Sequence, residues 1–298
     1  MSKRGNAIRP AGADRIYNVI NLILLIIVFL IVAYPLYFVV IASISDPMEV
    51  SRGSVILLPK GINFRGYERI FHFDQIWLGY RNTIFYTALG TLISVAATVL
   101  LAYPLSRKDF MLRSPLMVMV TITMFFSGGM IPTYLVINQM GMPDTVWAVV
   151  LPGAITATNV IITRTFFQSL PQELREAATV DGATNFKLFI YIILPLSKAI
   201  IAVIALFYAS GLWNQYFGPM LYLSKKDLYP LQLFLRQVLL QSDMEGVDVS
   251  AASMRDEQFL RELIKYGVII ISIVPMLCLY PFIQKYFVKG VMIGSVKG

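Results

Sequence analysis

The chain has 298 residues, of which 57% are hydrophobic and only 14% are charged, and its formal net charge is +8. Soluble domains carry about 25% charged residues, so this composition excludes an ordinary soluble protein and indicates a membrane protein. The basic residues are scattered between apolar stretches, as in loops that face the cytoplasm, and this pattern argues against nucleic-acid binding.

Six apolar stretches approach or exceed the roughly 20 residues that a helix needs to cross a bilayer. They lie at residues 16–42, 82–104, 114–137, 146–163, 199–221 and 266–284, and none contains Asp, Glu, Lys or Arg. The first is too long for the apolar region of a cleaved signal peptide. The sequence therefore predicts an all-α integral membrane fold with six transmembrane helices. We expect a single transmembrane domain over residues 1–298, with its core at about 82–284.

The short loops predict the orientation. Arg107, Lys108 and Arg113 lie between the second and third stretches, whereas residues 138–145 contain no basic residue. Cytoplasmic loops carry the excess of Lys and Arg, so both termini are predicted to be cytoplasmic. The N-terminus would then cover residues 1–15, and a cytoplasmic tail would cover residues 285–298.

Two predicted spans contain features that suit a substrate path. In the third, Gly128 and Gly129 precede Pro132 and are expected to interrupt the helix. Broken helices at membrane depth occur where the backbone lines a cavity or packs against protein, and close packing explains the glycines equally well. In the fourth, Asn159 is a polar residue inside the bilayer with the same two interpretations.

Residues 169–198, between the fourth and fifth stretches, are too long for a simple turn. Ser169 and Gln172 have capping-box spacing, which predicts a helix start. Leu174, Ala177 and Ala178 fall at i, i+3 and i+4 and predict one thin apolar stripe.

Gly182 is the expected end of this helix, because glycine readily adopts the left-handed C-terminal conformation. A second short helix is expected from Thr184 to just before Pro195, presenting Phe186 and Phe189. The segment is thus predicted to be an exposed helix–turn–helix, here called the coupling segment.

The coupling segment resembles the EAA signature of ABC-importer permeases. Glu176-Ala177-Ala178, Gly182 and Ile192-x-Leu194-Pro195 match every fixed position of that pattern. The resemblance implies a coupling helix that docks on a separate ATPase, with Glu176 as its ionic contact. The implied docking residues are Glu176, Ala177, Ala178, Asp181 and Gly182. The alternative is an amphipathic helix on lipid headgroups, which acidic side chains suit poorly.

The fifth stretch contains Trp213, Asn214, Gln215 and Tyr216. Aromatic faces with amide donors can hold a sugar ring by stacking and hydrogen bonding. An interhelical hydrogen bond with an interfacial aromatic belt explains the same residues.

Two further segments resemble carbohydrate permeases of the maltose-permease class (MalG-like). They are the C-terminal KYFVKGVMIGSVKG and residues 125–152, the latter similar to an oligosaccharide and polysaccharide branch. The resemblance implies a bacterial inner-membrane importer subunit that passes a carbohydrate, expected to be an oligosaccharide, from an extracytoplasmic solute-binding protein to the cytoplasm. It also implies a heterodimer with a second permease, two ATPase subunits that carry ATP and Mg, and no cofactor on this chain.

Several kinds of chemistry are not supported by the sequence. There is no Gly-Lys pair, so the chain has no P-loop, and the single His72 and Cys278 cannot build an ordinary zinc cluster. The chain is therefore predicted to be a transport subunit rather than an enzyme. A membrane-embedded enzyme acting on lipid or glycan would need convergent ionisable residues. A secondary carrier is disfavoured by the charge-free spans.

Overall fold

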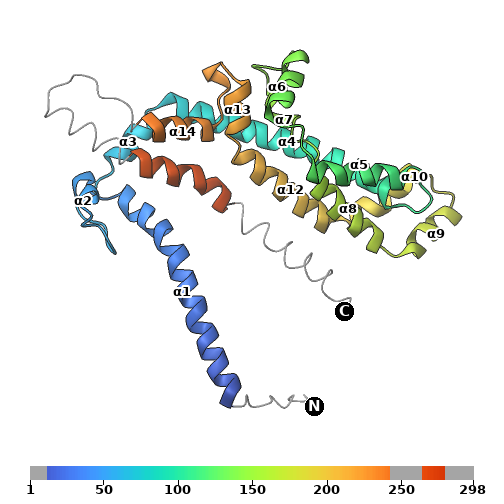
Figure 1. Ribbon diagram of the computed structural model, residues 1–298, viewed down its shortest axis with the longest axis horizontal. Coiled ribbons are helices and arrows are strands. Elements are labelled where there is room, and N and C mark those ends of the chain that lie inside the picture. Colours follow the sequence, from blue (N-terminus) through green and yellow to red (C-terminus); the bar gives the residue numbers. More distant parts are fainter. Residues whose placement is uncertain (1–11, 242–263, 279–298) are drawn as a thin grey trace. The chain divides into compact units, whose positions relative to one another are not determined.

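The computed structural model describes residues 12–241 and 264–278, and every regular element in these ranges is a helix (Figure 1). The all-α fold class is therefore confirmed. The helices are α1 (Gly12–Ser43), α2 (Pro47–Ser51), α3 (Arg65–Phe71), α4 (Asp74–Ser106), α5 (Arg113–Phe125), α6 (Met130–Gln139), α7 (Val146–Val150), α8 (Ala157–Ser169), α9 (Gln172–Val180), α10 (Asn185–Leu188), the π-helix η1 (Phe189–Ile193), α11 (Leu194–Leu196), α12 (Lys198–Trp213), α13 (Phe217–Tyr222), the 3₁₀-helix η2 (Lys226–Leu228) and α14 (Leu231–Gln241). An apolar helix also covers Ile264–Cys278.

Two of the described helices, Ile16–Ser43 and Asp74–Ser106, are long and apolar enough to cross a membrane. Two bent pairs qualify if each is counted as one span. Arg113–Phe125 and Met130–Gln139 bend by 117°, and Asn185–Leu196 and Lys198–Trp213 bend by 78°. The first bend lies at the predicted Gly128–Gly129 interruption, where Gly129 has φ +84°. The count of six spans stays a prediction.

The predicted fourth stretch, 146–163, is not one continuous helix. Helix α7 ends at Val150 and α8 begins at Ala157, with no helix in between. Pro152 has no backbone N–H to donate, and Gly153 has a low helix propensity. This dipeptide therefore interrupts the backbone hydrogen bonds that a continuous helix over residues 146–163 would need. The fifth stretch is also interrupted, between Trp213 and Phe217.

The contacts divide the chain into two compact units, residues 1–70 with 246–270 and residues 71–245 with 271–298. In the first unit, Ile41 and Ala42 at the end of α1 pack against Val50 and Val55. The Tyr67 hydroxyl donates to Ser43 Oγ at 2.8 Å, which ties α3 to the end of α1. The predicted single domain stays a prediction. The predicted tail 285–298 and most of the N-terminus lie outside the described residues.

The second unit is organised around α4, against which α12, α8 and α14 pack (Figure 1). At its C-terminal end, α4 contributes to a buried cluster with α8, α9, α10, η1 and α12: Val99, Ala102, Tyr103, Phe167, Ala178, Leu188, Phe189, Ile193, Ile200, Ile204 and Tyr208. Near its N-terminal end, Asn82 Nδ2 donates to the carbonyls of Asp227 at 2.7 Å and Tyr229 at 3.1 Å. One helix thus connects the base of the coupling segment with the loop after α13.

Candidate functional site

The coupling segment folds as two helices around a glycine turn. Helix α9 ends at Val180, and Asp181 follows as its C-cap. Gly182 has φ +73°, and no atom lies within 4 Å of a Cβ placed on it. The Ala183 N–H donates to the Ala178 carbonyl at 2.9 Å and closes the turn. Glycine is needed here for its backbone conformation and not for space.

The start of α9 differs from the prediction. The Ser169 hydroxyl donates to the Phe166 carbonyl at 2.8 Å, and Pro171 occupies the N-cap position without a side-chain cap. The capping-box prediction is therefore wrong. Pro171 imposes extended backbone on the residue before it, so Ser169 remains the last residue of α8 and cannot reach the amides of α9.

Of the three residues in the predicted apolar stripe of α9, only Ala178 is buried. Ala178 is 5% exposed and packs in the buried cluster, whereas Leu174 is 38% exposed and Val180 is 88% exposed. Ala177 is also exposed. Since Ala178 is the residue that α9 buries in the core, the exposed apolar residues Leu174, Ala177 and Val180 remain available to contact a partner protein.

The second helix was predicted to end before Pro195, and this prediction is wrong. Thr184 caps α10 as expected, its hydroxyl accepting from the Lys187 N–H at 3.3 Å. The chain then continues through the π-helix Phe189–Ile193 into α11, which contains Pro195. The wider turn of the π-helix accommodates Pro195, which has no backbone N–H to donate to the helical hydrogen bonds. Phe186 is 68% exposed, but Phe189 is 5% exposed and belongs to the core.

The charged face of α9 borders a pocket of about 770 Å³. Glu176 Oε1 accepts from Gln172 Nε2 at 2.9 Å, so a neighbour one turn earlier holds the exposed carboxylate. Arg175 Nη2 donates to the Phe167 carbonyl at 2.8 Å and fixes α9 on α8. Lys108 of the α4–α5 loop lines the same pocket. The pocket thus has one wall from α9 and one from this loop.

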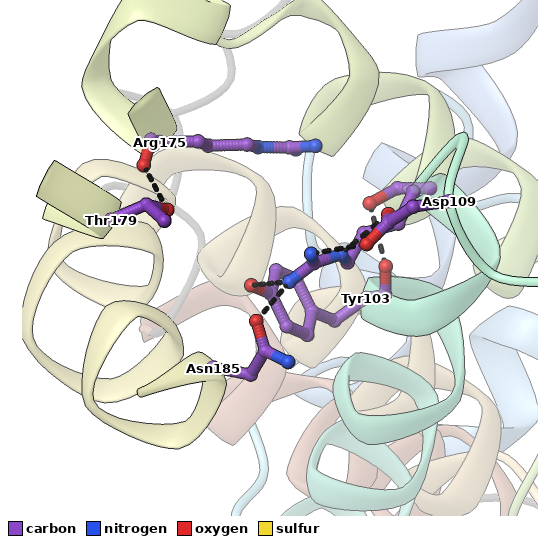
Figure 2. A network of polar contacts seen from close by, with 7 residues as sticks. Tyr103, Asp109, Arg175, Thr179 and Asn185 are labelled. Carbon is purple, nitrogen blue, oxygen red and sulfur yellow. Dashed lines mark hydrogen bonds and ion pairs between the residues drawn. The ribbon is translucent and has the colours of Figure 1, made fainter. Parts of the chain in front are cut away.

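The structure adds two residues that the sequence analysis did not select, Arg107 and Asn185. Arg107 Nη1 donates to Asn185 Oδ1 at 2.6 Å and so joins the α4–α5 loop to the first residue of α10 (Figure 2). The sequence shows that Arg107 closely follows a predicted span, but this position by itself indicates only the orientation of the chain in the membrane. Nothing in the spacing of 78 residues indicates its partner.

The residues predicted for a substrate path do not form one surface. Trp213 is 4% exposed, and its indole N–H donates to the Ser272 carbonyl at 3.1 Å. Asn214 caps α12 and donates to the Ser210 carbonyl at 2.9 Å. Tyr216 is 44% exposed, with the Arg236 guanidinium 6.0 Å from its ring centroid. Of these residues, Tyr216 is the one with an accessible ring.

The other candidates lie elsewhere in the second unit. Gln215 packs near Gly218, with its Nε2 2.7 Å from a Cβ placed there. Asn159 is 6% exposed in α8, whereas Gly128 has open space around it. The role of these residues stays a prediction.

Asp144 holds the loop between α6 and α7 to the end of α13. Its backbone has φ 56°, and its N–H donates to the Tyr222 carbonyl at 2.9 Å. Oδ1 accepts from the N–H groups of Ser224 at 2.6 Å and Lys225 at 3.0 Å. These backbone hydrogen bonds lower the pKa of the Asp144 carboxyl below its ordinary value.

Stability should therefore depend on pH through Asp144. A carboxyl whose pKa is lowered on folding contributes stability above its unfolded pKa of about 4 and loses it as pH falls through the folded pKa. We expect wild type to lose melting temperature relative to Asp144→Asn as pH falls below about 4, because asparagine keeps the acceptor and tolerates this φ. Tryptophan fluorescence of the detergent-solubilised chain measures this difference, and parallel curves for the two proteins would contradict it.

Comparison with known proteins gives a consistent result. The family model "Binding-protein-dependent transport system inner membrane component" matches residues 13–293. The polygalacturonan/rhamnogalacturonan transport system permease protein YtcP of Bacillus subtilis (strain 168) is 41% identical over 288 residues, 96% of this chain and 99% of that protein. Protein LplC of the same organism is 40% identical over 286 residues, 96% of each chain. The crystal structure of a bacterial ABC transporter involved in the import of the acidic polysaccharide alginate contains a chain with a TM-score of 0.86 and 33% identity, covering 93% of this chain and 99% of that chain.

Proposed function

Because the chain belongs to the family of binding-protein-dependent transport system inner membrane components, we propose that it moves a carbohydrate across the bacterial inner membrane as one permease subunit of an ATP-binding-cassette importer. It is a transport subunit and not an enzyme. The observation that carries the mechanism is the geometry of α9 and its Gly182 turn, which leave Glu176 and Ala177 of the EAA triplet exposed while Ala178 anchors the helix in the core.

The substrate class is proposed from two of the three relatives above 30% identity, the two whose descriptions name a polysaccharide. One is named for polygalacturonan and rhamnogalacturonan, and the other belongs to an importer of alginate. Polygalacturonan and alginate are both built from uronic acids, so an oligosaccharide that carries carboxylates is the favoured substrate. Arg236 and the accessible Tyr216 ring would suit such a sugar by charge and by stacking. The earlier candidates Gly128, Gly129 and Asn159 remain in the proposed path.

The proposed topology has six spans with both termini in the cytoplasm. The bent pair α5–α6, the interrupted α7–α8 segment and α12 with α13 would each count as one crossing, since breaks are tolerated where protein or a cavity satisfies the backbone. This orientation places α9 and the α4–α5 loop in the cytoplasm, where an ATPase can reach them.

ATP binding would draw two coupling segments together and turn the cavity outward, and hydrolysis would reset it. Glu176 is the proposed ionic contact to the ATPase, with Ala177 and Asp181 at the docking surface. Ala178 and Gly182 would fix the position of that surface from behind. The remaining partners are a second, different permease chain, two ATPase subunits that hold ATP and Mg, and a solute-binding protein.

The test is co-purification with the neighbouring permease and ATPase, followed by ATP hydrolysis in proteoliposomes. We expect Glu176→Arg to abolish assembly or to reduce hydrolysis stimulated by the loaded binding protein by about tenfold or more, because it reverses the charge at the contact. Glu173→Arg is the matched control, with the same charge change on the same helix.

Equal effects of the two substitutions would show that Glu176 has no specific role. A wild-type chain that recruits no ATPase would overturn the importer proposal itself. A membrane-embedded enzyme or a secondary carrier would then have to be reconsidered.

A further inference from the structure

Arg107 is the first residue after α4 and contacts three separate parts of the second unit. Its Nε donates to Asp109 Oδ1 at 2.9 Å, within the α4–α5 loop. Its Nη1 donates to Asn185 Oδ1 at 2.6 Å and lies 3.5 Å from the Tyr103 hydroxyl. Figure 2 shows Tyr103, Asp109 and Asn185 converging on this point. One guanidinium therefore bridges α4, the loop and the coupling segment.

The Asp109 pair orients this bridge. The hydrogen bond from Arg107 lowers the pKa of the Asp109 carboxyl, and the nearby Arg175 charge adds a smaller attraction. The same hydrogen bond raises the pKa of Arg107, so both groups stay charged at physiological pH. Arg107 Nη2 also donates to Asp109 Oδ2, and a guanidinium held by two bonds to a carboxylate has a fixed plane. Its remaining Nη1 is thus already directed at Asn185 before any movement occurs.

Packing behind the bridge leaves α4 and the coupling segment few ways to move separately. The Tyr103 ring lies 4.7 Å from the Phe189 ring, centroid to centroid, in the buried cluster that also holds Ala178. Asn185 begins α10, directly after the Gly182 turn. A displacement of α9 and its turn must therefore either break the Arg107–Asn185 bond or carry the end of α4 with it.

Helix α4 can transmit such a displacement over a long distance. Its 33 residues correspond to about 50 Å at 1.5 Å per residue. At its other end, the Tyr86 hydroxyl donates to the Leu228 carbonyl at 2.8 Å, and the Leu231 N–H donates to Thr83 Oγ1 at 2.8 Å. A movement of α4 at Arg107 would therefore also move the segment after α13, which is hydrogen-bonded to α4.

We infer that Arg107 is a positioning residue that couples the α9–α10 segment to α4 through Asn185, and so passes the movement of a docked ATPase to the far end of the permease. This inference rests on the proposed function and adds a second route of coupling beside the docking surface. Arg107 touches neither the ATPase nor the substrate in this scheme.

The test uses Asn185→Ala in the full complex with the partner permease, ATPase and binding protein. Asn185 is exposed, and its loss leaves the Arg107–Asp109 pair intact, so the chain should fold. We expect unchanged assembly and basal ATP hydrolysis, with stimulation by the loaded binding protein reduced about fivefold or more. Asn185→Asp should restore stimulation, because its carboxylate still accepts from the guanidinium. Lys108→Ala, in the same loop, is the control without effect.

Three results would overturn the inference. The first is wild-type stimulation in either Asn185→Ala or Arg107→Lys, since alanine removes the acceptor and lysine lacks the fork that joins Asp109 to Asn185. The second is loss of assembly in Asn185→Ala, which would make Asn185 a direct ATPase contact. The third is failure of Asn185→Asp to restore stimulation. By contrast, a wild-type chain that binds no ATPase would refute the proposed function, and this inference with it.

Discussion

Phe167→Ala is expected to lower the free energy of unfolding by about 3 kcal/mol or more and to weaken assembly with the ATPase. The Phe167 side chain is 0% exposed in the buried cluster beneath the coupling segment. Its ring makes an edge contact with the Tyr103 ring at 6.2 Å between centroids. Alanine leaves a cavity between α4, α8 and α9 that the surrounding helices can fill only in part.

The functional part of this prediction follows from the position of the cavity. Ala178 contributes only a methyl group to the same cluster, so α9 depends on its neighbours for a firm base. With Phe167 removed, α9 should shift even though Arg175 can still donate to the carbonyl of residue 167. The readouts are the melting temperature of the detergent-solubilised chain and the yield of complex at a permissive temperature.

Phe186→Ala is the matched control. It removes the same kind of side chain, from α10 instead of α8, but Phe186 is 68% exposed, so the stability change should stay within about 0.5 kcal/mol. Any loss of assembly in this variant would then reflect the docking surface and not the core. Similar melting temperatures for the Phe167 and Phe186 variants would show that the cluster does not support α9 as described.

Gly79→Val is expected to have the second large effect, a loss of about 2–4 kcal/mol in stability. A Cβ at Gly79 would lie 3.1 Å from the Cα and 3.3 Å from the N of Leu231, the first residue of α14. Backbone atoms cannot yield as a flexible side chain does, so α14 must move away from α4. That movement weakens the hydrogen bond from the Leu231 N–H to Thr83 Oγ1, which is 2.8 Å long and buried.

Gly211→Val provides the comparison for Gly79→Val. Gly211 also lies inside an apolar helix, but a Cβ there has no neighbour within 4 Å. Valine at this position should change stability by less than about 1 kcal/mol, because it meets no atom and improves helix propensity slightly. Thermal unfolding of the two variants measures the difference. Equal destabilisation would mean that valine itself, and not the approach of α14, is responsible.

The sequence predicted the local features of the coupling segment well, because they depend on short-range physics. The Gly182 turn and the Thr184 cap require specific backbone or side-chain chemistry within a few residues, and both lie where predicted. The interruption at Gly128–Gly129 was predicted for the same reason. The capping box at Ser169 was wrong, since Pro171 decides the backbone between the two helices.

The continuity of the membrane helices was predicted less well. An apolar run shows that a segment can lie in the bilayer, but it does not show where the helix breaks. Residues 146–163 and 199–221 read as single spans, yet each contains a non-helical interval. Trp213 illustrates the same limit for side chains. The sequence left it open between a sugar contact and an interhelical hydrogen bond, and the partner of its indole N–H, Ser272, lies in a helix about 60 residues further along.

By itself the sequence determined that the chain is an all-helical membrane protein with an EAA coupling segment, because composition, apolar length and motif spacing are properties of contiguous residues. The tertiary structure alone decided which residues of α9 stay exposed, and it brought Arg107 to Asn185 and placed Phe167 and Ala178 in one buried cluster. These contacts join residues distant in the chain, and their energy depends on how whole helices pack around α4. No local pattern in the sequence records that packing.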